Sequence, residues 1–147
     1  MKVYRITTAK WADKLSGSGF PARWNSKGKY VIYSASTRAL ACLENLVHRS
    51  GEGLNQNFKI AEITIPNESS IWNVQAHELP DEWYKTKHYP KCQKIGDSWI
   101  DSGETLLLRV PSSIIREETN ILINPNHREF SQVSITSIMP FRFDERL

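Results

Sequence analysis

The chain is poor in cysteine and has no long apolar run. Its 147 residues include only two cysteines, Cys42 and Cys92, and neither belongs to a Cys-x-x-Cys pair. This argues against a disulfide framework, and we expect two reduced thiols. No apolar run approaches the ~20 residues that a membrane-spanning helix needs. The opening stretch MKVYRITTAKWADK also lacks the apolar core of a signal peptide. These absences predict a soluble protein of the cytoplasm that does not bind a membrane.

The sequence lacks the motifs of two common kinds of site, metal centres and Rossmann-type dinucleotide sites. The histidines show neither His-x-His, His-Glu-x-x-His nor Cys/His ligand spacing, so no metal site is expected; they are His48, His77, His88 and His127. The glycines at 17 and 19 lack a third glycine and a following helix, so they do not form a dinucleotide-binding turn of the Rossmann type. The sequence therefore predicts no recycled dinucleotide cofactor.

What is present is typical of one globular domain over residues 1–147. Hydrophobic residues make up 39% of the chain and charged residues 24%, which excludes disordered and fibrous classes. The net charge of +3 is enough to attract a phosphate-bearing ligand. It falls short of the dense basic clusters of a dedicated nucleic-acid-binding protein.

Local patterns predict more strands than helices. Strands are expected over 2–7, 30–35, 58–66, 105–111, 119–125 and within 133–143. A helix is expected over 37–49, with Ser36 as its N-cap and Gly51 as its C-terminal stop. A Gly- and Ser-rich loop covers 16–28, and short helical turns are expected within 78–85 and 96–103. Because strands and helices do not alternate, we predict an α+β fold, with one central β-sheet flanked by helices.

The expected helix carries a carboxylate where apolar side chains should be. Leu40, Leu43 and Val47 recur at helical spacing and predict the buried side. At roughly 100° per residue, Glu44 lies only about 40° from Leu40 on the helical wheel. The plain interpretation is that Glu44 reaches solvent or pairs with a lysine. The functional interpretation is that a ligand occupies that side.

Several stretches, in this order along the chain, resemble the RES domain family. They are RWNSKG, VIYSA, LACLENLVH, GDSW, RVPSS and NILINPNH, within a similarity that spans about residues 2–140. The resemblance implies a fold similar to ADP-ribosyltransferase toxins and an activity that breaks the nicotinamide–ribose bond of NAD⁺. It also implies a toxin of a RES–Xre toxin–antitoxin pair.

The resemblance also implies the site and the partners. Carried over by position, the site residues are Arg5, Arg23, Tyr33, Glu44 and Ser112. The implied partner is an Xre-type antitoxin with a helix-turn-helix domain. Promoter DNA would be reached only through that antitoxin, and a homodimer could form within a larger toxin–antitoxin complex.

The residue types suit that chemistry. Breaking the bond gives the ribose oxocarbenium character, which a carboxylate such as Glu44 stabilises. Arg5 and Arg23 offer planar, bidentate donors for a pyrophosphate. Tyr33 can present its ring to the cationic nicotinamide. Ser112 can hydrogen-bond the nicotinamide amide or a ribose hydroxyl, or place the nucleophile. We therefore expect catalytic roles for Glu44, Ser112 and Arg5.

Substrate binding is expected from Arg23, Tyr33 and Asn25, the last of these near the phosphates. Plainer interpretations remain for these groups: an arginine packed on the surface by its aliphatic stem, a tyrosine that only fills the sheet, and Ser112 as the start of a turn or a helix cap. The acceptor could be water, phosphate or a protein side chain.

A second function, from another class, is a nucleic-acid-binding or RNA-cleaving toxin. Aromatic and basic residues interleave between 83 and 99, a pattern typical of single-strand binding; they are Trp83, Tyr84, Tyr89, Trp99, Lys85, Lys87, Lys91 and Lys94. The same patch could instead bind the antitoxin. A third alternative is a binding module that has lost activity.

Overall fold

The computed structural model, which describes residues 1–50 and 53–147, is built on one seven-stranded sheet. The strand order is β4-β5-β6-β2-β1-β3-β7; β4 and β5 are parallel and the other neighbours are antiparallel. The strands are β1 (Lys2–Thr8), β2 (Ile32–Ala35), β3 (Phe58–Thr64), β4 (Ile71–Asn73), β5 (Leu107–Pro111), β6 (Thr119–Ile123) and β7 (Ser134–Phe141). The helices are α1 (Arg38–Arg49) and α2 (Tyr89–Ser102), with short 3-10 turns η1 (Ala9–Trp11), η2 (Ala76–Glu78), η3 (Thr86–His88) and η4 (Arg128–Gln132).

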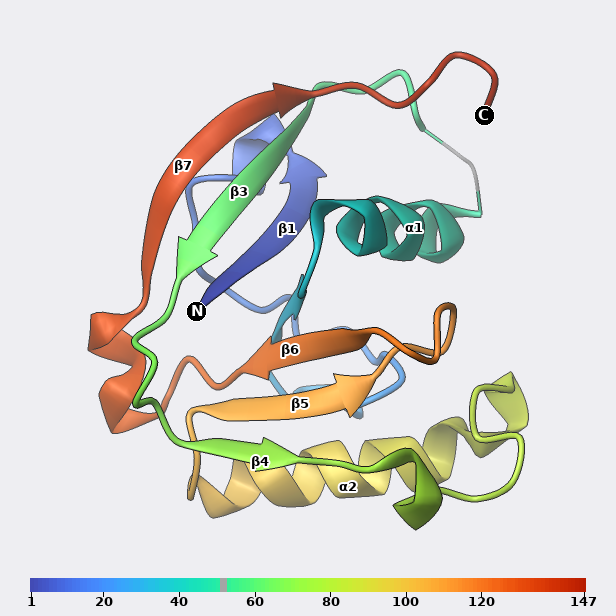
Figure 1. Ribbon diagram of the computed structural model, residues 1–147, viewed down its shortest axis with the longest axis vertical. Coiled ribbons are helices and arrows are strands. Elements are labelled where there is room, and N and C mark those ends of the chain that lie inside the picture. Colours follow the sequence, from blue (N-terminus) through green and yellow to red (C-terminus); the bar gives the residue numbers. More distant parts are fainter. Residues whose placement is uncertain (51–52) are drawn as a thin grey trace.

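The sheet bends at its centre. In Figure 1, β1, β3 and β7 rise steeply, whereas β4, β5 and β6 run across the view. The short strand β2 joins these two halves, and it pairs with β1 in a single register, Tyr4 opposite Ala35. The α+β prediction is confirmed, and strand β4 was not predicted from the sequence.

Both helices cover the same face of the sheet, each over one half. Tyr33 and Ala35 lie two residues apart in β2, so they point to the same face. Tyr33 packs against the apolar cluster that contains Trp99 of α2, whereas Ala35 belongs to the cluster that contains Leu40 of α1. The boundary between the part of the sheet that α1 covers and the part that α2 covers therefore lies at β2.

The opposite face of the sheet carries a third apolar cluster. Its buried members come from both halves and are Val3, Ile32, Ile63, Ile65, Leu106, Leu107, Ile121, Ile123 and Val133. Phe130 of η4 packs against this cluster at its edge. Burial of these side chains at about 1.5–3 kcal/mol each joins the two half-sheets.

The N-terminus of α1 differs from the prediction by one residue. Thr37 is the N-cap, and its Oγ1 accepts a hydrogen bond from the Leu40 backbone N–H at 3.1 Å. Ser36 was the predicted cap, but its own N–H donates to the Thr119 carbonyl and keeps it in strand pairing. At the other end Ser50 adopts the left-handed conformation, with φ 52°. Gly51, the predicted stop, lies outside the described residues.

Helix α2 is much longer than the short turn predicted over 96–103. It covers 14 residues, and its buried side comprises Cys92, Gly96 and Trp99, at helical spacing. Because cysteine and glycine carry little hydrophobic signal, the apolar period was not evident in the sequence. The other predicted turn, within 78–85, is a turn over residues 81–84 between η2 and η3. Within the described part of the chain, no helix is long and apolar enough to cross a membrane.

Candidate active site

Glu44 turns from α1 toward the sheet and is held there by two side chains. Its Oε1 accepts hydrogen bonds from Ser112 Oγ at 2.9 Å and from Asn120 Nδ2 at 2.6 Å. The carboxylate is half-buried, and within residues 1–50 and 53–147 no donor contacts Oε2. One oxygen is thus fixed in place while the other remains available to a ligand.

Ser112 is fully buried just after β5, and its hydroxyl both accepts and donates hydrogen bonds. The oxygen accepts hydrogen bonds from the Ile114 and Ile115 backbone N–H groups, at 3.0 and 3.2 Å. The single hydroxyl proton is donated to Glu44. Ser112 therefore begins a turn and also contacts Glu44, and in this arrangement it positions the carboxylate.

Asn120 was missed by the sequence reasoning. It lies near the start of β6, opposite Ala35 of β2, and its side chain points to the face covered by the helices. The signal available in the sequence was a polar residue, Asn120, at the start of the apolar run NILI. An asparagine just before a strand more often belongs to a turn, so this signal did not point to a site.

Tyr33 and Asn25 lock the Gly- and Ser-rich loop onto the sheet. The Tyr33 hydroxyl donates to Asn25 Oδ1 at 2.6 Å and accepts from the Trp24 N–H at 3.2 Å. Burial raises the pKa of Tyr33 well above its ordinary value, so it stays neutral. The Asn25 amide donates to three carbonyl groups, those of Phe20, Ser26 and Lys29. Asn25 is buried and fully engaged within the loop, which gives it a positioning role here and leaves the predicted phosphate contact unsupported.

Arg23 lies against the turn that precedes η3. Its Nη1 and Nη2 donate to the carbonyl oxygens of Trp83 and Tyr84 at 3.0 and 2.8 Å. The guanidinium also lies 4.5 Å from the ring centroid of Tyr89. A guanidinium has five N–H donors, and these two hydrogen bonds use two of them.

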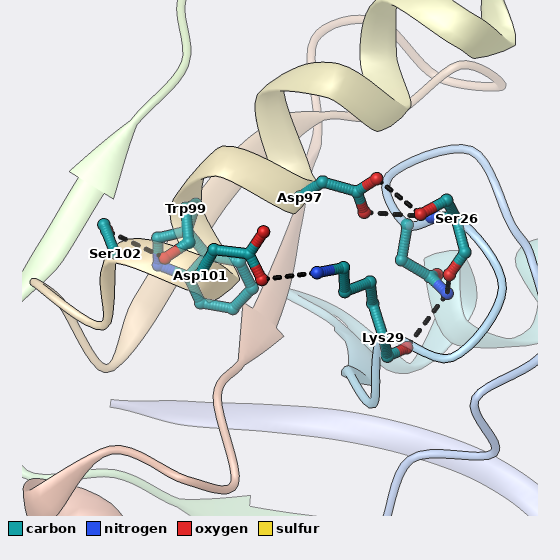
Figure 2. Close-up of polar contacts among 7 residues, drawn as sticks. Ser26, Lys29, Asp97, Trp99, Asp101 and Ser102 are labelled. Carbon is teal, nitrogen blue, oxygen red and sulfur yellow. Dashed lines mark hydrogen bonds and ion pairs between the residues drawn. The ribbon is translucent and has the colours of Figure 1, made fainter.

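The loop that carries Arg23 is fastened to α2 by two acidic residues. Asp97 accepts from the backbone N–H and the hydroxyl of Ser26, at 2.9 and 2.5 Å, and Lys29 Nζ lies 2.6 Å from Asp101 Oδ1 (Figure 2). The loop also approaches α2 very closely at Gly96, where an added Cβ would lie 1.7 Å from the Trp24 carbonyl oxygen. The GDSW stretch therefore anchors the loop.

These groups form two walls on one face of the sheet. We call Glu44, Ser112 and Asn120 the acid wall, and Arg23, Asn25 and Tyr33 the arginine wall. Tyr33 is paired with Leu122, two residues beyond Asn120 in β6. Such diagonal neighbours lie roughly 7–8 Å apart, so the two walls adjoin.

Arg5 lies elsewhere. Tyr4 and Ile6, its neighbours in β1, pack with the α1 cluster, so Arg5 points to the opposite face. Its Nη1 donates to the Lys14 carbonyl at 3.3 Å, and burial lowers its pKa. The structure does not bring Arg5 to Glu44, and its catalytic role stays a prediction without geometric support.

Two hollows of about 470 and 330 Å³ also lie away from the two walls. The larger is lined by His48, Arg49, Gly53 and Gln56 at the C-terminal end of α1. The smaller lies between residues 54–58 and 140–142. Neither includes a residue of the acid wall or the arginine wall. No group of three or more potential metal ligands occurs within the described ranges.

Comparisons with known proteins agree with this architecture. The solved structure of the M. tuberculosis MbcT–MbcA toxin–antitoxin complex contains a chain of similar fold, with a TM-score of 0.79. The match covers 96% of this chain and 84% of that one at 16% sequence identity. It establishes the fold.

Two curated relatives are more similar to this chain in sequence than that structure is. The Prs ADP-ribosylating toxin of Sphingobium sp. (strain YBL2) is 38% identical over 141 residues, covering 92% of this chain and 88% of the relative. The Toxin Res of Yersinia enterocolitica is 36% identical over 153 residues, covering 100% and 99%. The model of the RES domain matches residues 2–144. The chain therefore belongs to the RES domain family.

Proposed function

We propose that this protein is the toxin of a toxin–antitoxin pair, an enzyme that breaks the nicotinamide–ribose bond of NAD⁺. The observation that carries the proposal is the contact between Glu44 and Ser112, residues 68 positions apart that meet at 2.9 Å on the face of the sheet that also carries Tyr33. A carboxylate with one fixed and one open oxygen suits a reaction that develops positive charge on a sugar. The relatives named as toxins support the biological role.

In the proposed reaction, the bond between ribose C1′ and the pyridinium nitrogen breaks, and its electron pair neutralises the nicotinamide ring. An acceptor oxygen or nitrogen then bonds to C1′ and loses its proton to solvent. Glu44 Oε2 stabilises the positive ribose, a contribution of about 3 kcal/mol for comparable groups. The remaining N–H donors of Arg23 bind the pyrophosphate.

A protein side chain is the acceptor that the relatives favour, because one of them is named an ADP-ribosylating toxin. Water would instead make the protein a glycohydrolase, and phosphate would make it a phosphorylase. The proposed partner is an antitoxin with a helix-turn-helix domain. The similar fold within a toxin–antitoxin complex supports an antitoxin as the partner.

Burial argues against the nucleic-acid alternative. Trp83 and Trp99 are only 5% and 1% exposed and belong to the cluster under α2. Tyr89 is half-buried beneath Arg23. Aromatic side chains engaged in this way do not offer free faces on which bases could stack.

Mass spectrometry of the products tests the proposal. The purified protein is incubated with NAD⁺, with and without phosphate and a bacterial lysate, and a parallel sample receives total RNA. We expect nicotinamide release together with ADP-ribose, its 1″-phosphate or a modified protein, and intact RNA. Unchanged NAD⁺ under all conditions would overturn the proposal, and degraded RNA would favour the alternative.

The matched variant is Glu44→Gln, which keeps the shape of the side chain and removes its charge. We expect kcat to fall about a hundredfold without a change in fold, because the amide cannot stabilise the ribose cation. Glu104→Gln is the control, since Glu104 is exposed just after the C-terminal end of α2. Equal turnover in the two variants would remove the role assigned to Glu44.

A further inference from the structure

The segment between β5 and β6 connects the two walls. It begins at Ser112, which holds Glu44, and is closed by a hydrogen bond from the Ser112 N–H to the Glu118 carbonyl at 2.9 Å. Ile115 packs with the α1 cluster, and Thr37 at the start of α1 donates to the Glu118 carboxylate. The base of this segment is thus fixed to the acid wall.

Its next residue, Arg116, reaches the other side. The Arg116 guanidinium lies 4.8 Å from the ring centroid of Tyr84, while the carbonyl of Tyr84 accepts the hydrogen bond from Arg23 Nη2. Two arginines from segments far apart in sequence therefore meet at one tyrosine, one on its ring and one on its backbone.

Arg116 is the less engaged of the two. It is exposed, and within the described part of the chain it makes no hydrogen bond or ion pair. All five of its N–H donors are free for a ligand, and contact with a ring face holds the cation without consuming them. Arg23, in contrast, already donates to two carbonyl groups at the same place.

We propose that Arg116 is a substrate-binding residue that, with Arg23, binds the diphosphate of the dinucleotide. This inference rests on the proposed function and assigns a role to a residue that sequence reasoning did not select. A diphosphate carries several anionic oxygens on two phosphorus atoms, and two guanidinium groups can each bind it in bidentate fashion. The ribose of the same ligand would then lie toward Glu44, because the segment that carries Arg116 begins at Ser112.

The experiment compares Arg116→Ala, Arg116→Lys and a control, Arg128→Ala, which removes an exposed arginine of η4. Steady-state kinetics with NAD⁺ are combined with calorimetric titration of ADP-ribose. We expect Arg116→Ala to raise KM and weaken ADP-ribose binding roughly tenfold, the effect of losing one charge-assisted contact, with kcat within about twofold. Arg116→Lys should recover part of the loss, and Arg128→Ala should match the unmodified protein.

Failure of the inference and failure of the proposed function give different results. If the unmodified protein consumes NAD⁺ but Arg116→Ala leaves KM and ADP-ribose affinity unchanged, the inference is wrong and the proposed function stands. A fall in kcat alone would also overturn it, because it would mean that Arg116 only supports Glu44. If NAD⁺ is not consumed, the proposed function fails. The calorimetric titration then decides the inference: binding that depends on Arg116 supports it, and binding that does not, or no binding, overturns it.

Discussion

The acid wall and the arginine wall are built by different means. Glu44 is held by two side chains, Ser112 and Asn120, that come from regular strands or their ends. Arg23 sits on a loop without regular structure and is held mainly by backbone carbonyls. The loop itself depends on contact with α2 through Gly96 and Asp97.

This difference determines how each wall should respond to substitution. In the acid wall each hydrogen bond is a separate side-chain contact, so its loss should change catalysis more than folding. In the arginine wall the loop and α2 are packed backbone against backbone, so a change there should affect stability first. The following variants test that contrast.

The largest effect is expected from Gly96→Ala in α2. Its Cβ would lie 1.7 Å from the Trp24 carbonyl oxygen, and backbone cannot move away as a flexible side chain can. We expect a loss of about 3 kcal/mol in the free energy of unfolding, measured by urea denaturation. Ser98→Ala, on the exposed side of the same helix, should change it by less than about 0.5 kcal/mol. Equal midpoints for the two variants would show that the loop is not packed tightly on α2.

An intermediate effect is expected from Asn120→Ala in the acid wall. Glu44 keeps Ser112 but loses its shorter hydrogen bond, at 2.6 Å, so the carboxylate is less well oriented. We expect kcat for NAD⁺ cleavage to fall roughly tenfold, which corresponds to about 1.4 kcal/mol. The free energy of unfolding should fall by only about 1 kcal/mol.

The control for this variant is Asn126→Ala, an exposed residue in the turn after β6. It should retain full turnover. If Asn120→Ala unfolded the protein and left kcat of the folded fraction unchanged, the acid wall would resemble the arginine wall in its response, and the contrast would fail.

The smallest effect is expected from Lys29→Met, in the loop that carries the arginine wall. The hydrogen bond to Asp101 raises the pKa of Lys29, so this pair stabilises the fold below the ordinary lysine pKa. That contribution is lost as the pH rises through the raised pKa. We expect a small stability difference between Lys29→Met and the unmodified protein at neutral pH that narrows in 1 M salt and closes at alkaline pH.

Urea denaturation in a pH series from 7 upward measures this difference. Lys27→Met is the control, because Lys27 is exposed on the same loop. A difference that persisted at high pH would indicate that the stem of Lys29 packs on the loop and that its charge is irrelevant.

Much of the fold was predictable because strands are encoded locally. Six of the strands fall within or near ranges defined by β-branched runs and closing prolines. Strands β5 and β6 follow this rule well, because they lie within the predicted apolar runs 105–111 and 119–125, each of which ends in a proline. Helix α2 was not predicted as such, because its buried side uses Gly96 for close approach to Trp24. That requirement comes from a segment about 70 residues away and leaves no periodic signal.

The candidate site was predictable to a similar, partial degree. Glu44 stood out because a carboxylate on an apolar helix side conflicts with burial, and its meeting with Ser112 followed from the family resemblance. Arg5 was grouped with them by position alone, and strand alternation places it on the other face. Asn120 and Arg116 could not be found, since their roles depend on which residues meet across the folded sheet.

The narrow pairing between β1 and β2 has a mechanical consequence. With one register pair joining them, the backbone at the centre of the sheet resists bending only weakly. The apolar cluster on the far face therefore sets the angle between the half-sheets. We expect a methylene added to or removed from that cluster to change this angle, and with it the distance between helix α1 and helix α2. Packing of the apolar cluster on one face of the sheet thus influences the distance between the acid wall and the arginine wall on the other face.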